Sequence, residues 1–283
     1  MFPGTTLGPP RQRVGGYREY PAPPPLERYV EGVWTHHSPD RLPAGPGAMH
    51  RVLPDPALSL AFYCRRGDDG VPLEAGLVVI GPKTRPHIFA FRPALEVAAI
   101  RVKLEWSGPL LGLDPAGHED AEHPLATVNP RLESELLEPL AETLDASEAA
   151  ARLGALLSGR AAALEARGPT AAGYALDLVR RSGGAVGVER AAGHAGVPAR
   201  TLHRAVRRAA GISLKRFARV TRLLRAVALA DRSRGPSWAA IAAESGFCDQ
   251  SHLVRECRAL SGLAPGEVHR ERRAQEAETS NRG

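Results

Sequence analysis

An internal repeat in the C-terminal third of the chain constrains the fold more than any other feature of the sequence. Residues 188–208 align with residues 238–258, and Gly196 and Gly246 take the same place in the two copies. After this glycine the second copy has one extra residue, so that earlier matches lie 50 residues apart and later matches 51. Because turns tolerate insertions better than helices do, the repeat predicts a helix, a turn at the glycine and a second helix in each copy.

The second helix of each copy has an inward and an outward face. Leu202 and Val206, like Leu253 and Cys257, are four residues apart and are expected to face a core. Long donors on the opposite face are what base reading in the major groove and phosphate binding require. The repeat therefore predicts a double helix-turn-helix domain that binds DNA. The side chains expected to contact DNA are Arg200, Thr201, His203, Arg204 and Arg207 in the first copy, and Gln250, Ser251, His252 and Arg255 in the second.

The span between the copies, residues 213–231, predicts one connecting helix. Apolar residues recur in it at spacings of three and four, and four arginines follow another face. A helix of this length measures roughly 28 Å, close to the ~34 Å between successive major grooves on one DNA face. The connector is therefore expected to place the two second helices in successive grooves. A basic helical bundle without DNA-binding function is the alternative. The four arginines are Arg216, Arg219, Arg222 and Arg225.

Charge is distributed unevenly along the chain, which has a net charge of +6. Residues 1–168 carry 17 Lys and Arg against 21 Asp and Glu, whereas residues 169–283 carry 20 against 10. A genome-wide preference for arginine would affect both parts alike. The asymmetry thus indicates that the C-terminal part meets a polyanion and the N-terminal part does not.

The second copy closely resembles the signature of AraC-family transcription regulators, in the stretch WAAIAAESGFCDQSHLVRECRALSGLAP from Trp238 to Pro265. The first copy, from Gly196 to Gly211, is similar to the more variable first motif of that family. The resemblance implies that base contacts come mainly from Arg200, Thr201 and Arg204 in the first copy, and from Gln250, Ser251 and Arg255 in the second. We also expect the first copy, richer in outward arginine, to anchor more strongly and the second to add a different base preference.

The N-terminal part reads as a β-rich domain with a helical tail. Short apolar runs between turn signals predict four strands within residues 58–104, in an antiparallel sheet or small barrel. Leucines at helical spacing then predict two helices within residues 132–164. The fold class is therefore α+β multidomain. The expected divisions are an irregular lead-in at 1–20, a β-rich domain at 21–166, a double helix-turn-helix domain at 172–272 with a helix cap at Thr170, and a flexible tail at 273–283.

A weaker resemblance links the N-terminal part to the sensor-like domain of one branch of the AraC family. It rests on residues 20–34, on Leu53-Pro-Asp55 and on Gly81-Pro82, and it implies a cupin-like fold. Cupin-like barrels often bind a metal through closely spaced histidines and a glutamate, but no His-x-His followed by Glu occurs here, and adjacent His36 and His37 would point oppositely on a strand. We therefore predict no metal site, no cofactor and no catalytic residues.

These patterns predict a sequence-specific transcription regulator. The alternatives are a metal-dependent cupin-type enzyme fused to a DNA-binding module, and an architectural DNA binder without sequence preference. The predicted partner is double-stranded DNA, and a small-molecule effector, a second copy of the chain and RNA polymerase are further candidates. The N-terminus lacks the apolar core of a signal peptide, and no membrane span occurs in the sequence, so a cytoplasmic location is expected. Three scattered cysteines argue against a disulfide framework.

Overall fold

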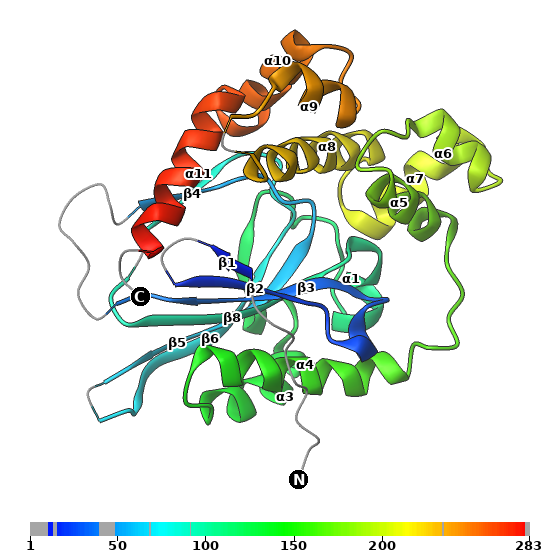
Figure 1. Cartoon of the computed structure of the whole chain (residues 1–283). Helices are drawn as coiled ribbons and strands as arrows, with labels where there is room; N and C mark the ends of the chain where they lie inside the picture. Colours follow the sequence, from blue (N-terminus) through cyan, green and yellow to red (C-terminus); the bar gives the residue numbers. More distant parts are fainter. Residues whose placement is uncertain are drawn as a thin grey trace.

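The computed structural model describes residues 11–13, 16–39, 49–67, 69–90, 92–233 and 235–280. Its N-terminal part is built on an antiparallel sheet of seven strands in the order β1-β2-β3-β8-β5-β6-β9 (Figure 1). The two central strands pair in register from Leu58 opposite Val102 to Arg65 opposite Leu95. The strands are β1 (Arg11–Arg13), β2 (Tyr17–Pro21), β3 (Val30–His37), β5 (Leu58–Arg66), β6 (Pro72–Ile80), β8 (Leu95–Val102) and β9 (Glu122–Pro124).

One face of this sheet is covered by two helices, α3 (Pro130–Ala141) and α4 (Ala146–Ala162), which lie below the sheet in Figure 1. Each begins at a residue that caps free backbone N–H groups: Asn129 accepts from Leu132, and Asp145 accepts from the second and third residues of α4. Five leucines of these helices are buried in the core below the sheet, and Leu137 and Leu156 are partly buried against it. Both predicted helices are therefore confirmed.

The opposite face of the sheet is partly covered by a separate pair of strands, β4 (Met49–Val52) and β7 (His87–Ala90). The four strands predicted within residues 58–104 are all present, but β7 pairs with β4 instead of joining the main sheet. Three short helices complete the β-rich domain: the 3-10 helix η1 (Pro24–Leu26), α1 (Leu104–Leu111) and α2 (Leu125–Val128).

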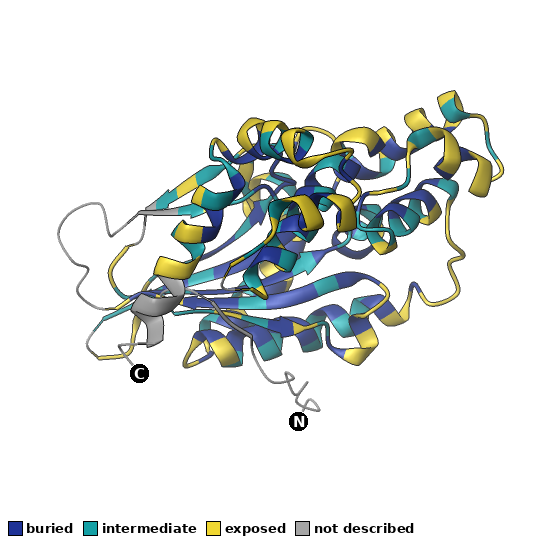
Figure 2. Cartoon of the chain, turned by 45° about the horizontal axis from the view of Figure 1, so that its top comes forward, coloured by how far each residue is buried: buried dark blue, intermediate teal, exposed yellow. Residues whose placement is uncertain are grey.

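Seven helices follow the β-rich domain and fill the upper part of Figure 1. In Figure 2 the strands are mainly buried, whereas these helices alternate between buried and exposed residues. The α+β fold class is confirmed: a β-rich domain precedes an all-helical region. The helices are α5 (Ala171–Arg181), α6 (Val188–His194), α7 (Ala199–Ala210), α8 (Leu214–Asp231), α9 (Trp238–Glu244), α10 (Gln250–Ser261) and α11 (Pro265–Ser280).

Two terminal segments differ from the sequence-based expectation. Within the lead-in predicted to be irregular, β1 and β2 form the edge of the main sheet, and β2 pairs with β3 from Arg18 opposite Thr35 to Pro21 opposite Gly32. Their tertiary pairing outweighs a Pro- and Gly-rich composition that shows no clear period. At the other end, α11 continues to Ser280, within the segment predicted as a tail.

Candidate nucleic-acid interface

The first motif consists of α6 and α7 joined by a turn at Gly196. This glycine has φ +66°, a left-handed conformation that residues with a Cβ adopt at a cost. Two backbone hydrogen bonds close the turn, from Gly196 N to Gly193 O and from Val197 N to Ala192 O, both 3.2 Å long. Helix α7 follows at Ala199, with Pro198 as its N-cap instead of its first residue.

The second motif, α9 and α10, repeats this geometry. Gly246 has φ +80°, and its N–H donates to Ala243 O at 3.2 Å while Phe247 N donates to Ala242 O at 2.9 Å. Each donor and each acceptor lies 50 residues after the corresponding group in the first motif. Helix α10 begins at Gln250, 51 residues after the start of α7, so the extra residue lies in the turn. The predicted repeat is confirmed.

The second helices of the two motifs present the expected faces. Leu202, Val206, Leu253 and Cys257 are all buried. Eight of the nine side chains predicted to contact DNA are exposed in the full chain, so the β-rich domain does not cover either face. They are Arg200, Thr201, His203, Arg204 and Arg207 on α7, and Gln250, Ser251 and Arg255 on α10.

His252 is the exception among these predicted contacts. Its side chain is half-buried instead of pointing outward. Its Nδ1 accepts from Cys248 N at 3.3 Å, and its ring packs edge-on against Phe247 with centroids 5.3 Å apart. The backbone N–H of His252 also donates to the capping carboxylate of Asp249. His252 therefore stabilises the turn that precedes α10. Its position on the outward face of the predicted helix does not reveal this role.

Three of the four arginines of α8 hold the domain together. Arg219 forms two hydrogen bonds with Glu256 of α10, at 2.7 and 3.1 Å. On the other side, Arg222 and Arg225 donate to backbone carbonyls of Gly184 and Ser182 in the turn after α5. Although α8 is basic in sequence, its arginines fix α10 and the turn that precedes α6 to one 18-residue helix.

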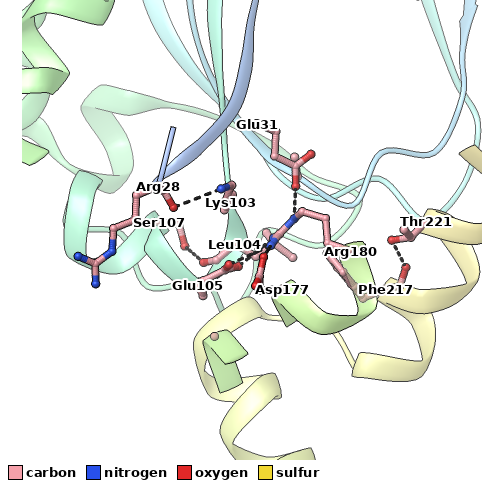
Figure 3. Close-up of polar contacts among 12 residues, drawn as sticks. Arg28, Glu31, Lys103, Leu104, Glu105, Ser107, Asp177, Arg180, Phe217 and Thr221 are labelled. Atoms are coloured by element: carbon pink, nitrogen blue, oxygen red, sulfur yellow. Dashed lines mark hydrogen bonds and ion pairs between the residues drawn. The ribbon is translucent and has the colours of Figure 1, made fainter. Parts of the chain in front are cut away.

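The first motif and its neighbouring helices α5 and α8 also contact the β-rich domain closely. Arg180 of α5 bridges two acidic residues of that domain: its Nε donates to Glu31 at 2.9 Å, and its terminal nitrogens donate to both oxygens of Glu105 at 3.1 and 3.2 Å (Figure 3). The guanidinium also lies 5.5 Å from the ring centroid of Phe217 in α8. Arg180 thus joins the β-rich domain, α5 and α8 at one point.

Two further contacts of this first motif lie close by. Gly211, which ends α7 with φ +73°, approaches the backbone of Pro115 so closely that a Cβ would lie 2.3 Å from its carbonyl oxygen. Arg216 at the start of α8 pairs with Glu119. The hydrophobic core is continuous here: Leu202 and Val206 belong to the same cluster as the sheet residues Leu60 and Ile100.

The second motif has a smaller contact with the β-rich domain. Arg51 of β4 pairs with Glu271 at 3.3 Å and donates to Ser261 O at 3.4 Å. Leu53 packs on a small cluster that includes Leu260 and Val268. Apart from these contacts, the second motif packs on α8 and α11.

The histidines of the β-rich domain make ordinary structural contacts. His36 and His37 point to opposite sides of β3, as predicted: the first is buried with Nε2 2.9 Å from Ser38 Oγ, and the second is exposed beside Glu96. His118 and His123 pack edge-on, 5.2 Å apart, and burial together with His123 lowers the pKa of His118. Across the described residues, no three His, Cys, Asp or Glu side chains are grouped to bind a metal. His50 lies outside the side chains that are described.

Comparison with known protein families identifies the C-terminal region. Residues 191–271 match the family described as "Helix-turn-helix domain", and the match spans both motifs and α8. The chain carries an AraC-type helix-turn-helix domain. It is a DNA-binding transcription regulator, and double-stranded DNA is its partner. Residues 18–123 match a second family, "Domain of unknown function (DUF6597)", which coincides with most of the β-rich domain that precedes the AraC-type domain.

Solved structures that match parts of the chain include regulators from several bacteria. The C-terminal domain of AraT, a response regulator from Geobacillus stearothermophilus, is 21% identical over 36% of this chain and 85% of its own length, with a TM-score of 0.34. ToxT from Vibrio cholerae is 12% identical over 79% of this chain and 97% of its own, with a TM-score of 0.43. None of the curated proteins compared matches the chain. In the described parts of the chain, no helix combines the length and apolar character needed to cross a membrane.

Proposed function

We propose that this AraC-type regulator reads a specific DNA sequence with both second helices, α7 in one major groove and α10 in the next. The observation that supports this most directly is the pair of exposed polar faces on one rigid support. The two motifs share the same turn geometry, and the arginines of α8 bind α10 and the turn that precedes α6. Two recognition helices held at a fixed distance and orientation can enter successive major grooves on one face of the duplex.

The exposed side chains divide by chemistry. Arg204 and Arg255 occupy matching places in the two copies, and an arginine in the major groove can donate two hydrogen bonds to guanine. Gln250 can pair with adenine in the same manner. The remaining exposed residues of the two faces are proposed to contact bases or phosphates, and His252 contributes by holding its turn. The excess of arginine on α7 favours stronger anchoring by the first motif.

We further propose that the β-rich domain controls the AraC-type domain through the contacts at Arg180, Gly211 and Arg216. Regulation then depends on the arrangement of the motifs, because both DNA-facing surfaces are already exposed. A small-molecule effector is the proposed signal, and RNA polymerase and a second copy of the chain stay predicted partners. The protein is proposed to act by binding and not by catalysis. Stoichiometric iron, zinc or manganese in the purified full chain would instead favour the enzyme alternative.

The test is a binding titration of the full chain on genomic DNA fragments at several salt concentrations. The full chain is needed because the first motif shares its core with the β-rich domain. We expect a selected fragment to bind at least about 1,000-fold more tightly than random DNA. Equal affinity for all fragments would reject sequence-specific reading and favour an architectural binder.

Matched substitutions sharpen this test. Arg204→Ala and Arg255→Ala are each expected to cost about 1–3 kcal/mol on the selected fragment, and less on random DNA, if the two arginines read bases. A uniform loss on all fragments would assign the arginine to phosphate instead. Arg131→Ala is the control: it removes the same charge from α3 in the β-rich domain, where the side chain is 92% exposed.

A further inference from the structure

A cavity of about 440 Å³ lies at the junction between the β-rich domain and α5. Its volume falls in the range of small-molecule sites, which often form where domains meet. One wall comes from α1 and the residue before it, and the other from the link at residues 167–170 and the first turns of α5. Figure 3 shows Lys103, Glu105 and Asp177 of this junction cavity near Arg180, with the Arg28 side chain pointing away from them.

Aromatic and proline side chains provide the apolar surface of the junction cavity. Trp106 of α1 is fixed in place by Tyr29, whose ring meets it edge-on at 4.8 Å, and by the guanidinium of Arg28, 5.1 Å from its centroid. Tyr174 of α5 lines the cavity and is 36% exposed, one of the few large hydrophobic residues on the described surface. Flat apolar walls of this kind favour a ligand with a flat apolar body.

The acidic residues of the junction cavity are already neutralised. Glu105 is paired with Arg180 through both carboxylate oxygens. Asp177 is paired with Arg181 at 2.6 Å and lies 3.7 Å from Arg180. Neither arginine lines the cavity. A ligand therefore meets two carboxylates whose charge is compensated from outside.

The basic residues of the junction cavity are compensated less directly than the acidic ones. Among the described residues, no carboxylate lies within 4.0 Å of the charged groups of Arg28, Lys103 or Arg167. Lys103 Nζ donates to two backbone carbonyls, Glu27 O at 2.7 Å and Arg28 O at 3.3 Å, which leaves one of its three N–H groups for a ligand. Burial, reinforced by the positive charge of Arg180, lowers the pKa of Lys103. The carboxylates of Glu105, Glu31 and Asp177 act on this pKa in the opposite direction, and an anion bound at Lys103 would add to their effect.

We propose that the junction cavity binds a small organic carboxylate with a flat apolar body, the carboxylate at Lys103 and the body between Trp106 and Tyr174. We take this ligand to be the effector of the DNA-binding domain, and this part of the inference rests on the proposed function. The ligand contacts both sides of the junction. It also lies beside α5, whose Arg180 connects the β-rich domain to Phe217 of α8, so its occupancy changes how firmly the first motif is held.

The experiment is isothermal titration of the full chain with 2-naphthoate, and with 2-naphthylmethanol as a neutral analogue of similar size. We expect saturable binding of the carboxylate and at least about tenfold weaker binding of the alcohol, because a charge-assisted hydrogen bond is lost. Lys103→Gln is expected to weaken naphthoate binding by a similar factor. Lys215→Gln is the matched control: it removes the same charge from an exposed site on α8 outside the cavity, and it should change the affinity less than twofold.

Tyr174→Ala provides a second variant that does not depend on Lys103, since its side chain is partly exposed and its loss leaves the core of α5 intact. It should weaken naphthoate at least threefold. No saturable binding of naphthoate, or equal binding by the wild type and both cavity variants, would overturn the site.

The DNA titration separates this inference from the proposed function. Equal affinity for all DNA fragments without naphthoate rejects sequence-specific reading, whatever the cavity binds. Naphthoate that binds as expected and changes affinity for the selected fragment by at least threefold supports the effector role. Naphthoate that binds without any change in DNA affinity overturns that role.

Discussion

The two helix-turn-helix motifs have the same backbone geometry but different surroundings. In the first motif, Leu202 and Val206 belong to the large core that continues into the sheet. In the second, Leu253 lies in a cluster of six buried residues shared with the end of α8. The first motif is thus part of the β-rich domain's core, whereas the second is attached mainly through α8 and α11.

This difference shows which properties of each motif come from its own sequence and which come from its surroundings. The sequence unit alone fixes the turn and the exposed face, which are alike in both copies. Its surroundings fix how strongly each copy is positioned, since burial and buried ion pairs come from other parts of the chain. A signal in the β-rich domain should therefore act on the first motif before the second. The four predictions below test this contrast, each with a matched pair of positions or a single switchable contact.

The largest contrast is expected between Leu202→Ala and Leu253→Ala, two fully buried leucines at matching places. Truncating a buried leucine costs roughly 2–5 kcal/mol. For Leu202 we expect a loss of about 4 kcal/mol in the free energy of unfolding of the whole chain. For Leu253 we expect the loss to be confined to the second motif.

Urea unfolding combined with hydrogen exchange distinguishes these outcomes. Leu202→Ala should speed amide exchange in the sheet as well as in α7, and Leu253→Ala only in α9, α10 and the end of α8. Identical exchange patterns for the two variants would contradict the unequal embedding of the motifs.

The next contrast concerns the ion pairs that fix each motif. Arg180→Ala leaves Glu105 almost fully buried without its partner, and we expect it to cost about 2–3 kcal/mol, less than a fully buried pair because Arg180 keeps some exposure. Arg51→Ala removes a more exposed pair with Glu271 and should cost less than about 1 kcal/mol. Thermal unfolding measures both, and a larger loss for Arg51→Ala would reverse the comparison.

Glycines at the ends of α7 and α10 offer a third matched pair, 51 residues apart. Gly262→Ala places a Cβ 3.9 Å from a terminal nitrogen of Arg51, an ordinary contact, at φ +78°. It should cost roughly 1–2 kcal/mol for the left-handed conformation alone. Gly211→Ala adds a collision with Pro115 O, which should cost about 1 kcal/mol or more in addition. Equal losses in stability for Gly211→Ala and Gly262→Ala would show that α7 can move away from Pro115 without a cost in free energy.

The smallest expected effect is an acid dependence of the second motif. Burial acts to raise the pKa of Glu256, but its hydrogen bonds to Arg219 and the charge of that arginine outweigh burial and hold the pKa below its usual range. Because the pKa is lower in the folded state, the pair stabilises the fold above the ordinary glutamate pKa of about 4.3, and this contribution is lost as the pH falls through the folded pKa.

We therefore expect amide exchange in α10, relative to the intrinsic rate at each pH, to lose protection worth about 1 kcal/mol or less below about pH 4. Glu256→Gln should be less protected at neutral pH and should lack this acid-dependent loss. The same acid-dependent loss in Glu256→Gln would assign the effect to another carboxyl group.

Much of the DNA-binding domain could be predicted from the sequence. The position of the turn follows from Gly196 and Gly246, since their left-handed backbone favours glycine. The buried faces follow from apolar residues four apart, such as Leu202 and Val206, because a helix brings such positions to one side. These are short-range rules that act within a few residues.

Other features depend on residues that are distant in the sequence. Strand β2 is stabilised by pairing with β3, so a Pro- and Gly-rich composition gave no signal for it. His252 has an outward spacing on α10, yet its Nδ1 accepts from the turn before the helix. In the sequence, Arg219 cannot be distinguished from the other basic residues of α8. Its ion pair with Glu256 becomes apparent only when α8 and α10 pack together.

The sequence by itself thus determined that two helix-turn-helix units exist and which faces they expose, because hydrophobic period and backbone conformation are local properties. Only the tertiary structure decided that the first unit joins the core of the β-rich domain, that Arg180 connects Glu31 with Glu105, and that a cavity remains beside Lys103. The physical reason is that burial and charge pairing depend on groups that the folded chain brings together from positions as many as 220 residues apart.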